Sequence, residues 1–152
     1  MTEPAMYKNI LIPTDGSKPS GRAVAHGLRL ARATGSRVTG LFVAPAPIPL
    51  IFEGLVPVRH LQLDEHAALS ARAAARYLGV IEKAAKQAGV ACECVTVTGE
   101  YPADAILDMA ARQKCDLIVM ASHGRRGLAG VFLGSETQKV LTQATLPVLV
   151  VR

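Results

Sequence analysis

The residues best suited to ligand binding lie in a glycine-rich segment, GRRGLAGVFLGSETQ, which follows Ala121, Ser122 and His123. Glycine occupies positions 124, 127, 130 and 134, and it lets backbone N–H groups turn toward an anion without an obstructing Cβ. Arg125 and Arg126 add positive charge that could pair with phosphate oxygens. Each feature alone fits an ordinary turn, but together they predict a phosphate-binding loop.

A helix is expected to begin directly after this loop, because Ser135-Glu136-Thr137-Gln138 has the pattern of a capping box with Ser135 as N-cap and Gln138 at the third position. The free N–H groups and the positive dipole end of such a helix attract phosphate. Glu136 suits the helix dipole but would repel phosphate unless its side chain points outward. The helix start therefore extends the predicted phosphate site.

A second polar segment, Pro13-Thr14-Asp15-Gly16-Ser17, ends an apolar run near the N-terminus. Asp15 is the one acid expected at the same site, where it could bond a ribose hydroxyl or touch Mg²⁺ indirectly. His123 could act as a general acid or base, but a turn residue or phosphate donor is the simpler interpretation. No efficient enzyme is predicted. Slow ATP hydrolysis, or self-phosphorylation on a nearby hydroxyl (Ser122, Ser135 or Thr137), is the lesser alternative.

Apolar runs and helical periodicities alternate along the chain and define the elements that position these loops. Strands are predicted over 9–14, 36–43, 90–98, 116–121 and 147–151, and helices over 18–34, 63–88, 102–112 and 136–144. Continuous apolar strands joined by helices predict a parallel sheet covered on both faces.

The simplest architecture is an α/β fold with one doubly wound sheet of five parallel strands, formed by a single domain over 1–152. We predict the strand order 3-2-1-4-5, because the alternating third strand and the short last strand both suit sheet edges. Ligands in such sheets bind beyond the carboxyl ends of the strands, where the strand order reverses. The loops after the first and fourth strands should therefore face each other across one crevice.

Composition limits the function classes. Of the 152 residues, 50% are hydrophobic, 4% are aromatic and Trp is absent, which argues against disorder and against base-stacking nucleic-acid platforms. The net charge of +5 mildly favours anionic partners, although most basic residues between positions 18 and 37 fit a solvated helix face. No apolar stretch approaches a membrane span, and the polar start MTEPAMYKN does not resemble a signal peptide. We expect a soluble cytoplasmic protein without membrane association.

The three cysteines do not predict a disulfide framework. Cys92 and Cys94 lie two residues apart in a predicted strand, so both should point to one face as small, partly buried groups. A C-x-C pair can ligate metal, but no other Cys or His nearby would complete the ligand set. No metal site is predicted.

Two familiar nucleotide motifs are missing: the chain contains neither G-x-x-x-x-G-K-[ST] nor G-x-G-x-x-G after its first strand. The acids that a response-regulator receiver needs are absent as well.

The sequence instead resembles the universal stress protein family along essentially its whole length. The likeness lies in the opening KNILIPTDGS, the turn VMASHGRRG, the helix start LGSETQKVL and the ending PVLVVR. ATP-binding members carry the pattern G-x2-G-x9-G-[ST], which here becomes Ala121-x2-Gly124-x9-Gly134-Ser135. The spacing is kept, and Ala121 replaces the first glycine, which puts one backbone contact to the ligand in question.

This resemblance implies an ATP site in the predicted crevice, with or without Mg²⁺, and a homodimer paired through the last strand, Pro147–Val151. It implies that Asp15 and Val43 contact the ribose and adenine, that Met120 lines the base pocket, and that Gly124, Gly134 and Ser135 hold phosphates. The full set of candidate nucleotide-contacting residues is Pro13, Thr14, Asp15, Val43, Met120, Ala121, His123, Gly124, Arg125, Arg126, Gly127, Gly134, Ser135 and Glu136. A dimeric interaction module of the same fold, without nucleotide, is the alternative.

The segment 44–62 is unusually long and apolar for a loop, with prolines at positions 45, 47, 49 and 57. Three interpretations stay open: a lid over the crevice, a contact with a second subunit or another protein, and a plain hydrophobic flap over the long helix.

Overall fold

The computed structural model describes residues 3–47, 59–125, 127 and 133–152. Strands and helices alternate along the chain: β1 (Asn9–Pro13), α1 (Lys18–Thr34), β2 (Arg37–Pro45), α2 (Arg59–Ala88), β3 (Cys92–Gly99), α3 (Pro102–Arg112), β4 (Leu117–Ala121), α4 (Ser135–Gln143) and β5 (Val148–Val151). The strands form one parallel sheet in the order β3-β2-β1-β4-β5, which confirms the predicted order. The strand order therefore reverses between β1 and β4.

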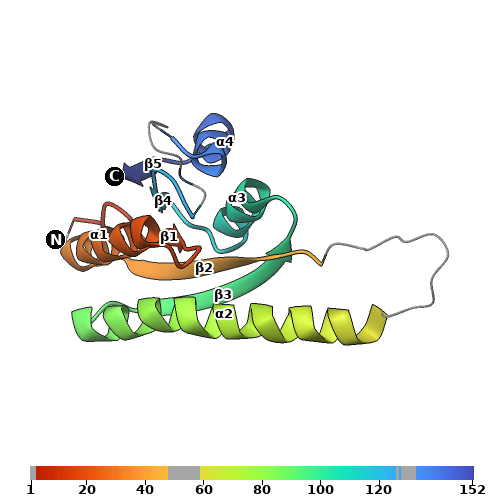
Figure 1. Ribbon diagram of the computed structural model, residues 1–152. Coiled ribbons are helices and arrows are strands. Elements are labelled where there is room, and N and C mark those ends of the chain that lie inside the picture. The colour runs from red at the N-terminus through yellow and green to blue at the C-terminus, as the bar shows by residue number, and fades with distance from the viewer. Residues whose placement is uncertain (1–2, 48–58, 126, 128–132) are drawn as a thin grey trace.

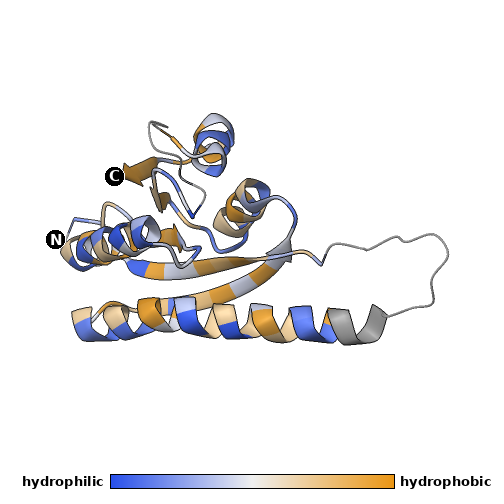
Figure 2. Ribbon diagram, in the orientation of Figure 1, coloured by the Kyte–Doolittle hydropathy of each residue, from blue (hydrophilic) through white to orange (hydrophobic). Residues whose placement is uncertain are grey.

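Each face of the sheet is covered by a different pair of helices. Residues that alternate along the strands, such as Ile10 and Leu11 of β1, enter two separate apolar clusters. The first cluster joins the sheet to α1 and α2, and the second joins it to α3 and α4. Figure 2 shows the strands as largely hydrophobic, whereas α1 and α2 alternate between hydrophobic and hydrophilic residues. The sheet core is thus buried on both sides, as the continuous apolar runs predict.

Helix α2 is long enough to project past the sheet (Figure 1). It packs on β2 and β3, and its N-terminal turns extend beyond the ends of those strands. Despite its length, neither α2 nor another described helix has the apolar composition needed to cross a membrane.

The turn that leads from β1 into α1 is built from local signals. Ser17 is the N-cap of α1, and its hydroxyl accepts a hydrogen bond from the Ser20 N–H at 3.3 Å. Pro19 stands in the first turn, where its missing N–H costs nothing, and Gly35 ends the helix in the left-handed conformation. These residues fix α1 directly behind the loop after β1.

Several predicted boundaries shift in the structure. β2 extends to Pro45, β3 begins at Cys92, and α2 begins at Arg59, ahead of the predicted start at position 63. The capping box at α4 is wrong: Gly134 is the N-cap, no side chain caps the helix, and Ser135 is its first helical residue. The physical reason is that the Gly134 N–H bonds to the Ser122 carbonyl at 2.6 Å, which sets the helix start one residue earlier.

Candidate functional site

The loops after β1 and β4 meet at the point where the strand order reverses. The backbone N–H of Arg125 donates to Oδ2 of Asp15 at 2.9 Å, and Nε of Arg125 donates to the Asp15 carbonyl at 3.1 Å. These residues lie 110 positions apart in the sequence. The two loops therefore meet as predicted. The hydrogen bonds between Asp15 and Arg125 form the joint between them.

Asp15 organises the first loop as well. Its Oδ1 accepts hydrogen bonds from the Ser17 N–H at 2.9 Å and from the Ser20 hydroxyl at 2.7 Å. Burial alone would raise the pKa of Asp15, but the bonds from Ser17, Ser20 and the Arg125 N–H stabilise the carboxylate and lower the pKa below its ordinary value. Asp15 is therefore a charged, multiply bonded acceptor with both oxygens in use.

The side chain of Arg125 reaches across to α2. Its guanidinium carbon lies 5.2 Å from the centre of the Tyr77 ring, and Nη2 donates to the Tyr77 hydroxyl. The ring of Tyr77 in turn packs edge-on against Phe42 of β2, with the ring centres 5.4 Å apart. The sequence offered no local signal for Tyr77, because it lies in the middle of a regular helix.

The glycines of the second loop allow close contacts. A Cβ on Gly124 would overlap Oδ2 of Asp15, so glycine lets the loop lie against the carboxylate without displacing it. The Gly127 N–H donates to the Gly124 carbonyl at 3.2 Å, which closes a turn over the described part of the loop. Arg126 and Gly130 lie outside the described residues.

The hydroxyls beside this loop differ in exposure. Ser122 and Thr137 are each only 3% exposed. Ser122 pairs with Nδ1 of His123 at 3.0 Å, and Thr137 donates to the Ala121 carbonyl at 2.8 Å. Ser135 is exposed. Among the three hydroxyls considered for self-phosphorylation, only Ser135 is open to solvent, and His123 is occupied by a neighbouring hydroxyl rather than by a carboxylate.

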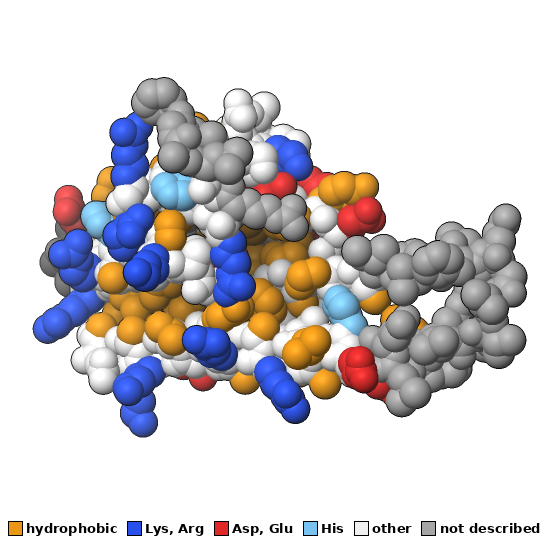
Figure 3. Space-filling view, in the orientation of Figure 1, with side chains coloured by type: hydrophobic (Ala, Val, Ile, Leu, Met, Phe, Trp, Pro, Cys, Tyr) orange, Lys and Arg blue, Asp and Glu red, His pale blue; other side chains and the backbone are white. Residues whose placement is uncertain are grey.

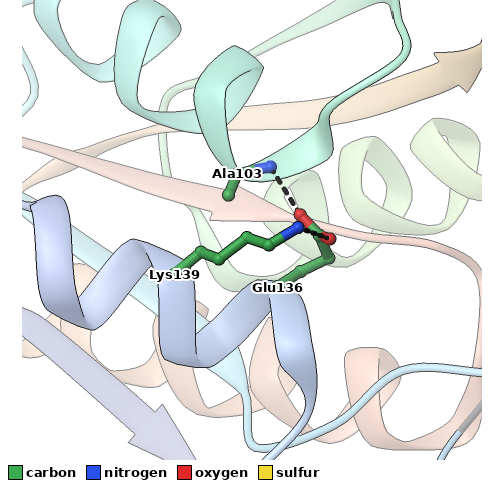
Figure 4. A network of polar contacts seen from close by, with 3 residues as sticks. All are labelled: Ala103, Glu136 and Lys139. Atoms are coloured by element: carbon green, nitrogen blue, oxygen red, sulfur yellow. Dashed lines mark hydrogen bonds and ion pairs between the residues drawn. The ribbon is translucent and has the colours of Figure 1, made fainter.

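Glu136 turns toward α3 (Figure 4). Its Oε2 accepts a hydrogen bond from the Ala103 N–H at 2.8 Å, and its Oε1 pairs with Lys139 at 3.0 Å. The carboxylate thereby caps the N-terminal turn of α3, where its charge is favourable. This orientation satisfies the condition under which Glu136 would not repel phosphate at the start of α4.

The remaining candidate residues lie at strand ends. Pro13 ends β1 opposite Leu41, and the Thr14 N–H bonds to the Leu41 carbonyl at 2.9 Å. Val43 and Met120 pack in the cluster beneath α3 and α4, and Ala121 is buried as the last residue of β4. The candidates thus surround the carboxyl ends of β1, β2 and β4, with Asp15 and Arg125 toward α2 and with Val43 and Met120 on the opposite face.

A cavity of about 230 Å³ opens on the α2 side of this site. Of the candidate residues that the structure describes, only Thr14 and Arg125 line it, together with residues that include Ser17 before α1 and Arg76 and Tyr77 of α2. Figure 3 shows hydrophobic side chains along the seam between α1 and α2, with Lys and Arg side chains around it. The volume lies below the roughly 300–1,000 Å³ of common ligand pockets, so this cavity would hold only part of a nucleotide.

Among the residues that the structure describes, no three His, Cys, Asp or Glu side chains gather as a metal site. Cys92 and Cys94 lie on one face of β3, as the period of the strand predicts.

Comparison with known proteins adds to this geometry. The profile of the Universal stress protein family matches residues 6–152. The chain is 33% identical over 149 residues to the universal stress protein MJ0531 of Methanocaldococcus jannaschii, covering 97% of this chain and 83% of that protein. The structure of protein MJ0577 superposes with a TM-score of 0.80 at 29% identity, over 96% of each chain. A universal stress protein crystallised with cAMP superposes with a TM-score of 0.67 at 26% identity, covering 96% of this chain and 97% of that one.

Proposed function

This chain belongs to the universal stress protein family, and from that premise we propose that it binds an adenine nucleotide, ATP, at the joint between the loops after β1 and β4. The observation that carries the proposal is the contact of Arg125 with Asp15 at the reversal of strand order, the usual ligand position in doubly wound sheets. The similar protein crystallised with cAMP supports the adenine nucleotide class.

The nucleotide would lie across the strand ends, with its phosphates toward the second loop. Gly124 and Gly127 leave the loop backbone without side chains, and Arg125 supplies positive charge. The first turn of α4 follows the same loop, and its first amides have no partner within the helix. Mg²⁺ would be held by the phosphates and not by Asp15, because the Asp15 carboxylate already accepts three hydrogen bonds.

The base and ribose would lie toward the ends of β1, β2 and β4. Half-buried Val43 offers apolar surface for adenine, and Met120 is buried in the same cluster. Oδ2 of Asp15 accepts one described hydrogen bond, from the Arg125 N–H, so it can accept a second from a ribose hydroxyl. Ala121 is buried at the end of β4, and its carbonyl accepts a hydrogen bond from Thr137. Its side chain is a single methyl group, the smallest departure from glycine at this position.

Nucleotide occupancy, rather than turnover, is the proposed signal. A hydrolase needs a positioned base and usually a carboxylate-bound metal. His123 is paired with Ser122, and Glu136 is paired with α3. We therefore infer a cytoplasmic stress regulator that reports nucleotide levels. Slow turnover, or phosphorylation of Ser135, would be a side reaction.

We further propose a homodimer paired through β5. The carbonyl of Pro147, which directly precedes β5, and the carbonyl of Val151 accept hydrogen bonds from the N–H groups of Ile118 and Ser122. Val148 and Val150 therefore direct their backbone groups to the other edge. No strand covers that edge in the part of the chain that the structure describes. An open edge with half-buried valines suits pairing with a second copy.

Val150→Pro removes one outward N–H and should shift the chain from dimer to monomer with an unchanged circular dichroism spectrum. Sedimentation equilibrium measures the effect, and Val150→Lys serves as the second variant. A monomeric natural chain, or a dimer that withstands both substitutions, would contradict pairing through β5.

The nucleotide proposal is tested by thermal unfolding with Mg-ATP, together with mass spectrometry of small molecules released from freshly purified protein. Ligand at 100 times its Kd should stabilise the chain by about 2.7 kcal/mol. Cyclic AMP and GTP serve as comparison ligands. If no adenine nucleotide shifts the melting temperature at millimolar concentration, the chain is the interaction module and the nucleotide proposal fails.

A further inference from the structure

Two cysteine thiols converge on the edge strand of the sheet, away from the nucleotide site. Cys92 and Cys94 lie on β3, both half-buried and both packed against the apolar cluster under α2. Their Sγ atoms are 3.9 Å apart. Neither residue takes part in the proposed nucleotide contacts.

Neighbouring residues make room for this convergence. A Cβ on Gly40 of β2, which pairs with Cys94, would stand 2.8 Å from the Cys94 sulfur, so the glycine leaves space for that sulfur. The Cys94 thiol also contacts the Leu78 carbonyl of α2 at 3.9 Å. The sulfur positions are therefore set by packing against two elements and do not depend on β3 alone.

The sulfur spacing fits two ligands of one ion. With metal–sulfur bonds of about 2.3 Å, a separation of 3.9 Å corresponds to an angle of about 116° at the metal, between tetrahedral and trigonal geometry. A disulfide fits less well, because residues two apart in a strand have Cα atoms about 6.6 Å apart, near the upper limit of about 6.8 Å.

Local charge also favours a cation. The negative charge of Glu82 acts on both thiols. A bound cation would offset that charge and hold both sulfurs as thiolates.

We propose that Cys92 and Cys94 form a two-thiolate site for a soft monovalent cation, Cu(I). Thiolates suit Cu(I) as well as Zn²⁺ and Fe–S clusters, and no third potential ligand joins the pair among the described residues. An ion satisfied by few ligands therefore fits better than Zn²⁺, which takes four in structural sites. Binding replaces two S–H bonds with two Cu–S bonds and releases two protons, and copper keeps its oxidation state.

A recess of about 180 Å³ lies beside Cys92. Cys92 lines it together with neighbouring residues of β2 and β3, which include Arg37 and Glu93. A small thiol from solution could approach through it and take the third position of a trigonal site.

The test is anaerobic titration of the reduced chain with Cu(I) in competition with a coloured Cu(I) chelator. The natural chain should retain one Cu(I) per chain. Cys92→Ser and Cys94→Ser should each weaken retention by more than about 100-fold, because loss of an outer partner alone already costs about 10- to 100-fold. Cys115→Ser is the matched control, because Cys115 packs in the other apolar cluster and should leave retention unchanged.

Cys92→Ala and Cys94→Ala replace the serine variants if either fails to fold by circular dichroism. The proposal is overturned if the natural chain surrenders its copper to the chelator, if the double variant retains it, or if Cys115→Ser abolishes retention.

Discussion

The loop after β1 and the loop after β4 face each other across the crevice, yet they are held by different kinds of contact. The first loop is fixed locally, since Asp15 accepts hydrogen bonds from Ser17 and Ser20 within five residues. The second loop is fixed at long range, since Arg125 bonds to Asp15 and to Tyr77 of α2. The Asp15 carboxylate therefore stabilises both loops, whereas the side chain of Arg125 stabilises only the second.

This difference predicts which substitutions disturb both loops and which disturb only one. Loss of Asp15 should disturb both loops, a side chain at Gly124 should separate them, and loss of Arg125 should free only the second loop. A change elsewhere on the surface should affect neither.

Asp15→Ala should have the largest effect. It removes an acceptor of three hydrogen bonds and leaves partly buried donors unpaired, so the free energy of unfolding should fall by about 3 kcal/mol. Urea unfolding followed by circular dichroism measures this. Asp15→Asn should cost less, because its carbonyl can still accept from Ser17 and Ser20 while its NH₂ group opposes the Arg125 N–H. Equal effects of the two variants would show that Asp15 does not join the loops.

The same carboxylate predicts a pH dependence. Because the pKa of Asp15 is lowered in the folded chain, its stabilising contribution is complete above the unfolded-state pKa of about 3.9 and is lost as the pH falls through the folded-state pKa. The natural chain should therefore lose more stability below pH 4 than Asp15→Asn does.

Gly124→Val should have the second largest effect. Its side chain would overlap Oδ2 of Asp15, which should cost about 1–3 kcal/mol of stability and push the loops apart. If the loop holds phosphate, ATP affinity should also fall roughly tenfold or more, a loss of at least about 1.4 kcal/mol. Calorimetric titration measures the affinity. An unchanged affinity in a folded variant would mean that the backbone at Gly124 does not approach the ligand.

Arg125→Ala should cost about 1 kcal/mol, because its contact with the Tyr77 ring and its hydrogen bonds are exposed. The backbone bond from residue 125 to Asp15 survives the substitution. Arg76→Ala is the matched control, since it removes one positive charge from the same cavity without a described bond to Asp15. Thermal unfolding should separate the two variants, and an equal shift in both would assign the effect to charge alone.

Gly79→Ala should have the smallest effect, and with the opposite sign. A Cβ at this position in α2 would meet nothing within 4 Å, so alanine should stabilise the helix by about 0.5–1 kcal/mol. ATP affinity should not change. A measurable change in affinity would mean that α2 is coupled to the nucleotide site beyond the contact of Tyr77.

The sequence predicted the strand order and the facing loops, because apolar runs, helical periods and turn residues are local signals. It missed the true N-cap of α4, because the decisive bond joins Gly134 to Ser122 across the loop. It likewise missed Tyr77 and the capping of α3 by Glu136. These contacts join residues far apart in the chain, and a regular helix pattern carries no mark of them. The predicted start of α2 is late, because residues 59–62 directly follow the proline-rich segment and were included in that loop.

Adenine nucleotide is proposed to bind where Asp15 and Arg125 join the two loops. The most direct test is an NMR titration of isotope-labelled protein with ATP, with each backbone amide followed separately. The account predicts that the largest shifts fall on the amides of Asp15, Gly124, Arg125 and Ser135, while the amides around Cys92 on β3 stay in place. Saturating ATP that leaves these four amides unmoved, or that shifts another face of the molecule instead, would contradict it.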